Sequence, residues 1–336
     1  MIERVRKANG GGAYFNAPAT DVKFFSTGCK VLDLALGGGW AENRIANIIG
    51  DRSTGKTLLA IEAAINFARK YPKGKIRYRE AEAAFDQGYA KALGMPLHRV
   101  DFGKQPLETI EDLFEDLDYS VKHNREPELY ICDSLDALSD RSELKRQMDE
   151  GTYGAEKAKK LSQLFRRLVR GMANVNITLI IISQVRSKIG VTFGRKWTRS
   201  GGRALDFYTS QVLVLAPLGT ISRTVNGIKR AVGIEVKAKV DKLKVGGSPF
   251  REAQFEISFT YGIDDVWACL SWLKEVGALS ELQLTEKTIK NYAKDLTEKP
   301  NAEEIKHLHK VVQNQWYRVE ASFRPKRGKY ESSVNP

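Results

Sequence analysis

One segment of the sequence has the residue types and spacing of a phosphate-binding loop. Residues 50–57 match the pattern Gly-x-x-x-x-Gly-Lys-Thr at every fixed position, between an apolar run at 45–49 and a helical pattern that begins at Leu58. Glycines let consecutive backbone N–H groups point at a polyphosphate, and the positive end of the following helix dipole favours the same anion. We therefore expect a nucleoside triphosphate to bind to Gly50, Asp51, Arg52, Ser53, Thr54, Gly55, Lys56, Thr57 and Leu58.

A second motif supplies a carboxylate for a metal ion. Residues 128–133 form an apolar strand pattern that ends in Asp133, which is how a Walker B aspartate is presented to Mg²⁺. An aspartate that only caps the following turn would have the same pattern, but the phosphate-binding loop upstream favours the metal. Lys56 would reach the β and γ phosphates, and we expect Thr57 and Asp133 to bind the Mg²⁺ ion.

Two glutamates are candidates for the group that aligns or activates water during hydrolysis. Glu80 and Glu82 follow the strand after the helix of the phosphate-binding loop, at the sheet edge where ligands bind in open α/β folds. Strand alternation places both side chains on the same side, so their spacing does not choose between them. Arg77 and Arg79 in the same run are unusual for a central strand.

The order of patterns predicts an α/β fold. Apolar runs alternate with helical patterns up to residue 183, which favours a mainly parallel sheet with helices on both faces. Strand patterns without intervening helices follow, which favours antiparallel strands at one edge of the sheet. The expected strands are residues 45–49, 75–78, 99–102, 128–132, 177–183, 211–216, 230–245 and 253–259. The expected helices are residues 56–71, 86–93, 107–123, 155–173, 264–277 and 285–312, with a helix start within 300–304.

The charge of the chain predicts a polyanionic partner. Lysine and arginine number 54 against 41 acidic residues, a formal net charge of +13, and residues 185–202 hold five cations and no acid. Phe193 and Trp197 are interleaved with these cations among glycines, a composition that suits phosphate contacts and base stacking on single-stranded nucleic acid. A solvated surface loop is the alternative. The segment follows the strand ending near Gln184, so Gln184 could touch a γ-phosphate while the loop touches nucleic acid.

Other classes of site are not indicated. The three cysteines, Cys29, Cys132 and Cys269, form no C-x-x-C motif, so we expect buried thiols rather than disulfides or zinc ligands. His307 and His309 lie two residues apart on an expected helix, and we assign them to a solvated face rather than to a metal. No run approaches the roughly 18 apolar residues of a membrane span, so we expect no membrane partner and a soluble, cytoplasmic protein.

Taken together, these motifs resemble the RecA family of DNA recombinases, from about residue 25 to residue 259. The compact chain is similar to the phage-encoded members. The resemblance is carried by Ser26-Thr27-Gly28, Leu32-Asp33, Gly37-Gly38-Gly39, residues 80–90, Asp133-Ser134 and residues 183–194.

The resemblance implies roles for residues around the nucleotide. Glu82 matches the catalytic glutamate of the family, and Gln184 matches its sensor glutamine. Asp86 and Tyr89 match the positions that contact and stack on adenine, which implies ATP as the cofactor with Mg²⁺. The catalytic residues implied in this way are Lys56, Glu82, Gln184, Lys242 and Lys244.

The resemblance also implies contacts between subunits. Lys242 and Lys244 match the paired lysines that reach across the filament interface to a neighbour's ATP. Asp206 and Phe207 match interface positions, although the family usually has a lysine before the phenylalanine.

The second DNA-binding loop of the family matches the basic segment, and its first loop matches residues 148–154. The residues expected to bind DNA are Arg186, Lys188, Ile189, Gly190, Val191, Phe193, Arg195, Lys196, Trp197, Arg199, Gly201 and Gly202.

Four segments are expected. Residues 1–25 form a short N-terminal segment for subunit contact, and residues 26–262 form the RecA-like ATPase core. Residues 263–322 form a small helical C-terminal domain, and residues 323–336 form a basic tail.

The function implied by the resemblance is ATP-dependent homologous recombination. The protein would polymerise on single-stranded DNA into a helical filament and exchange strands with double-stranded DNA, with DNA-stimulated ATP hydrolysis. A ring-forming helicase or translocase on the same core is one alternative, and we identify neither its usual arginine finger nor an accessory domain. A filament scaffold that binds single-stranded DNA without strand exchange is the other.

Overall fold

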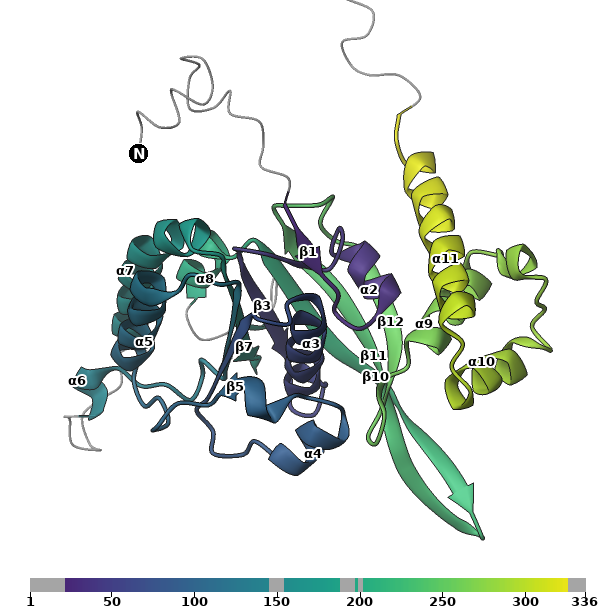
Figure 1. Cartoon of the computed structure of the whole chain (residues 1–336), viewed down its shortest axis with the longest axis horizontal. Helices are drawn as coiled ribbons and strands as arrows, with labels where there is room; N and C mark the ends of the chain where they lie inside the picture. The colour runs from purple at the N-terminus through teal and green to yellow at the C-terminus, as the bar shows by residue number, and fades with distance from the viewer. Residues whose placement is uncertain (1–21, 145–153, 188–196, 199–201, 326–336) are drawn as a thin grey trace, which may run out of the picture.

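A nine-stranded sheet forms the centre of the molecule (Figure 1). The computed structural model describes residues 22–144, 154–187, 197–198 and 202–325. In spatial order the strands are β13 (Gly262–Ile263), β12 (Glu252–Ser258), β11 (Ile228–Leu243), β10 (Gln211–Val225), β3 (Ile45–Gly50), β7 (Ile177–Gln184), β6 (Glu128–Asp133), β4 (Lys75–Glu80) and β5 (Val100–Asp101). Two short antiparallel pairs are β1 (Phe24–Phe25) with β2 (Trp40–Ala41), and β8 (Arg186–Ser187) with β9 (Trp197–Thr198).

The expected α/β class is confirmed by the pairing of the strands. From β10 to β5 all neighbours are parallel, and from β10 to β13 all neighbours are antiparallel. Every residue of β3 and β6 is buried, as continuous apolar runs in a parallel sheet require.

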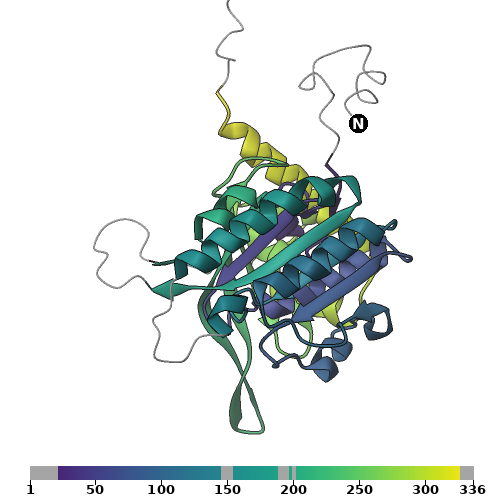
Figure 2. The same ribbon diagram turned by 90° about the vertical axis from the view of Figure 1, so that its left-hand side faces the viewer.

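Helices cover both faces of the sheet. The helices are α2 (Lys30–Ala35), α3 (Lys56–Lys70), α4 (Gln87–Ala92), α5 (Ile110–His123), α6 (Arg141–Leu144), α7 (Gly154–Asn174), α8 (Gly202–Tyr208), α9 (Asp265–Glu275), α10 (Ile289–Glu298) and α11 (Ala302–Ser322). Strand alternation divides the core: Leu129 and Ile131 pack with α3, while Tyr130 and Cys132 pack with α5 and α7. Figure 2 views the face on which α5 and α7 lie side by side. No helix within the described residues is long and apolar enough to cross a membrane.

One antiparallel pair extends well beyond the strand expected at 211–216. β10 and β11 continue past the sheet as a projecting hairpin (Figure 1), closed by Asn226 and Gly227 with φ of 50° and 77°. Two left-handed residues are what a tight hairpin turn requires. The extension was missed because its outer residues are mostly exposed and carry no apolar alternation, although Asn-Gly is a strong hairpin signal.

The two arginines of β4 are explained by acids on neighbouring elements. Arg79 is only 4% exposed, and its Nε lies 2.6 Å from Oδ2 of Asp116 on α5. Arg77 lies 3.4 Å from Asp116 and 3.3 Å from Glu128. Because α5 covers this face, Arg79 is buried and Arg77 is half-buried, and the carboxylate paired with each guanidinium offsets its desolvation.

The segment that leads into the phosphate-binding loop is held by Asp33. Its carboxylate accepts hydrogen bonds from Ser26 Oγ at 2.6 Å and from the backbone N–H and hydroxyl of Thr27, each at 2.7 Å. Its backbone oxygen accepts from the N–H groups of Gly38 and Gly39. Burial raises the pKa of Asp33 to about 6.

The C-terminal helices share the apolar core of the sheet. Leu270 of α9 and Val312 of α11 belong to the same buried cluster as α3. The division expected at residue 262 therefore stays a prediction. The helix start expected within 300–304 is present, because Asn301 accepts from the N–H groups of Glu303 and Glu304.

Two expectations for α11 were wrong. The helix continues to Ser322, beyond the expected end at 312, because Val312 and Trp316 extend its buried stripe. His307 is exposed, but His309 is half-buried, with Nε2 2.6 Å from Oδ2 of Asp265. The solvated position expected for His309 was wrong because α11 packs against α9.

Stability should depend on pH through Glu62 of α3, which lies at the junction with the C-terminal helices. Burial raises its pKa to about 7, against an ordinary value of 4.5, and Oε1 accepts from the N–H of Ile263 at 3.4 Å. The folded protein thus holds this proton more tightly than the unfolded chain. The stability that this adds is complete below about pH 4.5 and is lost as pH rises through about 7.

We expect Glu62→Gln to remove this dependence. Between pH 5 and pH 8 the unfolding free energy of the unmodified protein should fall by about 2 kcal/mol relative to the variant. Urea unfolding at both pH values measures the difference, with exposed Glu303→Gln as the control. Parallel pH profiles for the Glu62 variant and the unmodified protein would contradict the assignment.

Candidate functional site

The phosphate-binding loop connects the end of β3 to the start of α3. Ser53 and Gly55 have φ of 56° and 86°, and a Cβ at Gly55 would lie 2.4 Å from Cδ1 of Ile257. Glycine is therefore needed at this position. The helix begins at Lys56 without a side-chain cap, so its first N–H groups are directed at the loop rather than at a capping oxygen. Such an end can accept a polyphosphate.

Lys56 bends back over this loop. Its Nζ donates to the backbone oxygen of Asp51 at 2.6 Å. Burial lowers the pKa of Lys56, while the nearby carboxylates of Asp133 and Glu82 oppose that shift. A phosphate oxygen would offer the ammonium a charged acceptor in place of the carbonyl.

Thr57 and Asp133 meet as the sequence predicts for a Mg²⁺ site. Thr57 Oγ1 donates to Oδ2 of Asp133 at 2.9 Å, and the hydroxyl of Tyr78 donates to the same oxygen at 2.7 Å. Burial raises the pKa of Asp133, and the hydrogen bonds from Tyr78 and Thr57 lower it in part. A hydroxyl and a carboxylate are hard oxygen donors that fit Mg²⁺.

The structure separates the two candidate glutamates. Glu80 Oε1 accepts from the backbone N–H groups of Glu82 at 2.8 Å and Ala84 at 3.1 Å, so it shapes the loop after β4. Glu82 Oε1 accepts from Ser134 Oγ at 2.5 Å and from Gln184 Nε2 at 3.0 Å. Glu82 therefore faces the ends of β6 and β7, which favours it over Glu80 as the group that aligns water.

The two residues expected to contact adenine lie at the start of α4. Asp86 caps this helix, with Oδ1 accepting from the N–H of Tyr89 at 2.9 Å. Tyr89 is half-buried, and burial raises its pKa. The expected contact of both residues with adenine stays a prediction.

Lys242 and Lys244 do not join this group within one chain. Lys242 pairs with Val212 near the start of β10, whereas Gly50 at the loop pairs with Leu215, three residues or roughly 10 Å further along that strand. Because β11 runs antiparallel to β10, the lysines lie toward the amino-terminal ends of the parallel strands. The phosphate-binding loop lies at the carboxyl-terminal ends.

At the amino-terminal ends, the two lysines contact the end of α8. Lys244 Nζ donates to the backbone oxygen of Phe207 at 3.0 Å and lies 5.6 Å from the centre of its ring. Lys242 Nζ donates to the backbone oxygen of Asp206. Phe207 is 69% exposed, so this corner is open to solvent within one chain.

The base of the basic loop is a two-stranded ribbon. β8 follows Gln184 after one residue and pairs with β9, so that Arg186 lies opposite Thr198 and Ser187 opposite Trp197. Gly202 begins α8, and Gly154 begins α7 after the first expected loop. Most expected DNA-binding residues lie outside the described residues: Lys188, Ile189, Gly190, Val191, Phe193, Arg195, Lys196, Arg199, Gly201 and residues 148–153.

Three side-chain contacts at the site were not anticipated. Tyr78 and Ser134 donate to Asp133 and Glu82, and Asp136 accepts from the backbone N–H of Gln184 at 2.7 Å. Ser134 and Asp136 follow Asp133 closely in sequence, which was the available signal. Tyr78 gave no signal, because its contact depends on the register between β4 and β6.

Comparisons with known proteins point to one family. The family model of the RecA N-terminal domain matches residues 1–264. Protein RecA of Prochlorococcus marinus (strain MIT 9211) is 34% identical over 264 residues, which cover 77% of this chain and 68% of the relative. Protein RecA of Synechococcus sp. (strain WH7803) is 33% identical over 264 residues, which cover 77% of this chain and 65% of the relative. The matched region thus spans about two thirds of the length of these relatives.

The hydrogen bond from Tyr78 should matter for Mg²⁺. Tyr78→Phe frees Oδ2 of Asp133 from one donor and removes its orientation, so Mg²⁺-dependent ATP binding should weaken by roughly 10- to 100-fold. Binding measured without Mg²⁺ should change little. The matched control is Tyr130→Phe, because the hydroxyl of Tyr130 donates to Asp116 at 2.7 Å on the other face of the sheet. Equal losses in both variants would contradict this role of Tyr78.

Proposed function

Because this chain belongs to the RecA family, we propose that it is a DNA-dependent ATPase that polymerises on single-stranded DNA and catalyses homologous pairing and strand exchange. One observation carries the proposal. The side chain of Gln184 contacts Glu82, and the ribbon at the base of the basic loop begins at Arg186, two residues further along the chain. The end of β7 therefore connects the candidate ATP site to the candidate DNA loop, which follows it in the chain.

The proposed ATP chemistry assigns a task to each residue of the site. Lys56 exchanges the carbonyl of Asp51 for phosphate oxygens, and Thr57 and Asp133 hold Mg²⁺. The ion supplies positive charge that neutralises the phosphates. Glu82 orients the attacking water and accepts its proton, while Asp86 and Tyr89 hold adenine.

ATP acts as a switch in this proposal. The amide of Gln184 bonds Glu82 in the structure, and a γ-phosphate offers it a charged acceptor instead. Asp136 accepts a hydrogen bond from the backbone N–H of Gln184 and holds this backbone in place. A change in the hydrogen bonds of the Gln184 side chain would therefore be transmitted over two residues to β8. ATP would order the DNA-binding state, and hydrolysis would release it.

We propose that a second copy of the chain completes the site. Lys242 and Lys244 lie toward the sheet edge away from their own phosphate-binding loop, where they can face the ATP of a neighbour. One face then binds the opposite face of the next copy, and such a contact builds an open helical filament when its rotation does not close.

ATP turnover and negative-stain imaging of one sample, with and without single-stranded DNA, test this function. We expect DNA-stimulated hydrolysis and open helical filaments. Lys56→Ala should abolish ATP-dependent assembly, because the loop loses its only predicted phosphate-binding ammonium. Closed rings would favour the translocase, and filaments without turnover would favour the scaffold; either result overturns the proposal.

DNA binding should depend on the cations of the basic loop. Replacing Arg195, Lys196 and Arg199 by alanine should weaken binding to single-stranded DNA. The dependence of log K on log salt should flatten by up to about 0.7 per lost phosphate contact, or about 2 in total.

The control for that variant removes the same charge elsewhere. Lys287, Lys290 and Lys294 are exposed on and beside α10, and their replacement by alanine should leave the salt slope for single-stranded DNA unchanged. An unchanged slope in the loop variant, or an equal change in both, would assign the DNA site to another surface.

A further inference from the structure

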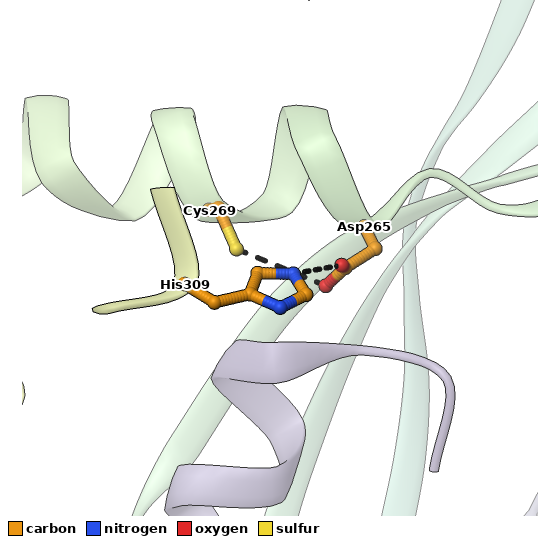
Figure 3. A group of neighbouring side chains, drawn as sticks. All are labelled: Asp265, Cys269 and His309. Carbon is orange, nitrogen blue, oxygen red and sulfur yellow. Dashed lines mark hydrogen bonds and ion pairs between the residues drawn. The ribbon is translucent and has the colours of Figure 1, made fainter. Parts of the chain in front are cut away.

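A cluster of three different metal-ligating side chains lies where α9 meets α11 (Figure 3). Asp265 and Cys269 are one helical turn apart on α9, and His309 comes from α11. One ligand atom from each residue lies within 4.8 Å of the other two. His309 Nε2 is 2.6 Å from Asp265 Oδ2, and Cys269 Sγ is 3.7 Å from Asp265 Oδ1. The packing of two helices therefore creates a donor set of oxygen, sulfur and nitrogen.

The surroundings hold the carboxylate and the imidazole in place. The backbone N–H of Lys30 donates to Asp265 Oδ1 at 2.6 Å, and this directs Oδ2 toward His309. The ammonium of the same Lys30 donates to Gln313 at 2.8 Å, one turn after His309 on α11. The N-terminal end of α2 thus fastens both helices that contribute ligands.

Apolar packing fixes the distance between the two helices. Leu308 and Val312 of α11 are fully buried on either side of His309, and Cys269 is fully buried on α9. Further along, the rings of Trp272 and Trp316 lie 5.3 Å apart. A site carried on rigid, packed helices is preorganised, because its ligands need only side-chain adjustments to bind.

We propose that Asp265, Cys269 and His309 form a binding site for a tetrahedral transition-metal ion, with Zn²⁺ as the ion that fits best. Thiolate, imidazole and carboxylate together are a zinc donor set, whereas Mg²⁺ takes oxygen ligands. Ligand atoms around tetrahedral Zn²⁺ are roughly 3.5 Å apart, given bonds of about 2.0 to 2.3 Å. Cys269 Sγ is 3.7 Å from Asp265 Oδ1, close to that spacing, whereas His309 Nε2 and Asp265 Oδ2 at 2.6 Å would have to move apart.

Binding requires small side-chain movements and the release of protons. The hydrogen bond between His309 and Asp265 opens by about 1 Å, and the ion takes the place of the proton between them. Nε2 gives up that proton by exchange with water, and the ring coordinates as the neutral imidazole that carries its proton on Nδ1. Cys269 coordinates as the thiolate, and its proton passes to water. Asp265 and His309 also line a cavity of about 660 Å³, from which a water molecule supplies the fourth ligand.

The ion would join the end of the sheet to the last helix. α9 begins two residues after β13. A metal bonded to both helices would therefore connect α11 to the sheet through α9 and β13. This role is independent of ATP and of the proposed recombinase activity. It also revises the expectation that neither Cys269 nor His309 is a metal ligand.

Co²⁺ titration of the full chain, freed of metal with a chelator, tests the proposal. Co²⁺ bound to a thiolate in a tetrahedral site gives a sulfur-to-metal charge-transfer band and intense d–d bands, and added Zn²⁺ should displace it. We expect one equivalent to produce these bands. Cys269→Ala should abolish the charge-transfer band, and His309→Ala should weaken binding by at least about 100-fold.

The matched control is His307→Ala, two residues away on α11 and exposed, which should leave Co²⁺ binding unchanged. Since Cys269 is buried and its replacement could disturb folding, the decisive variant is His309→Ala, whose side chain is 33% exposed. Circular dichroism checks its fold. No thiolate band at stoichiometric Co²⁺, or equal effects of the two histidine variants, would overturn the proposal and leave a half-buried Asp–His hydrogen bond beside a thiol.

Discussion

The parallel register of β3, β7, β6 and β4 is the constraint on which the candidate ATP site depends. Gly50 pairs with Gln184, and Glu80 pairs with Asp133, so four strands that are separated along the chain end on the same side of the sheet. From there the short distances follow: Thr57 reaches Asp133, and Glu82 reaches Gln184. A slip of one residue in any pair would turn every side chain of that strand to the other face. The buried carboxylate of Asp133 is tolerated because Tyr78 and Thr57 donate hydrogen bonds to it.

The antiparallel half of the sheet has the opposite consequence. Because β11 returns against β10, it carries Lys242 and Lys244 away from the loop that their sequence match associates with ATP. One chain therefore holds both halves of the proposed site at opposite ends of its strands. The half that contains the lysines lies next to the exposed ring of Phe207. Under the proposed function, a second copy of the chain would complete the catalytic group. Assembly and hydrolysis would then be coupled through the shared site.

The sequence predicted the local parts of this arrangement and missed the contacts between distant segments. The phosphate-binding loop and the aspartate at the end of β6 are set by short-range residue types, so spacing was enough to find them. Strand alternation did not choose between Glu80 and Glu82, and only the family resemblance selected Glu82. The contact of Glu82 with Gln184, 102 residues further along the chain, was not predicted. His309 was placed in solvent because its partner Asp265 is 44 residues away and appears only once α9 and α11 pack. Exposed strands such as the outer part of β10 lack the apolar pattern on which strand prediction relies.

Complementation between two inactive variants tests most directly whether the ATP site is shared between copies. One variant carries Glu82→Gln, and the other carries Lys242→Ala with Lys244→Ala. Each alone should form no competent site, but an equal mixture should regain DNA-stimulated ATP hydrolysis, because about a quarter of head-to-tail interfaces would pair an intact Glu82 with intact lysines. Partial recovery is the expected result. A mixture no more active than either variant, with both shown to bind DNA together, would contradict it.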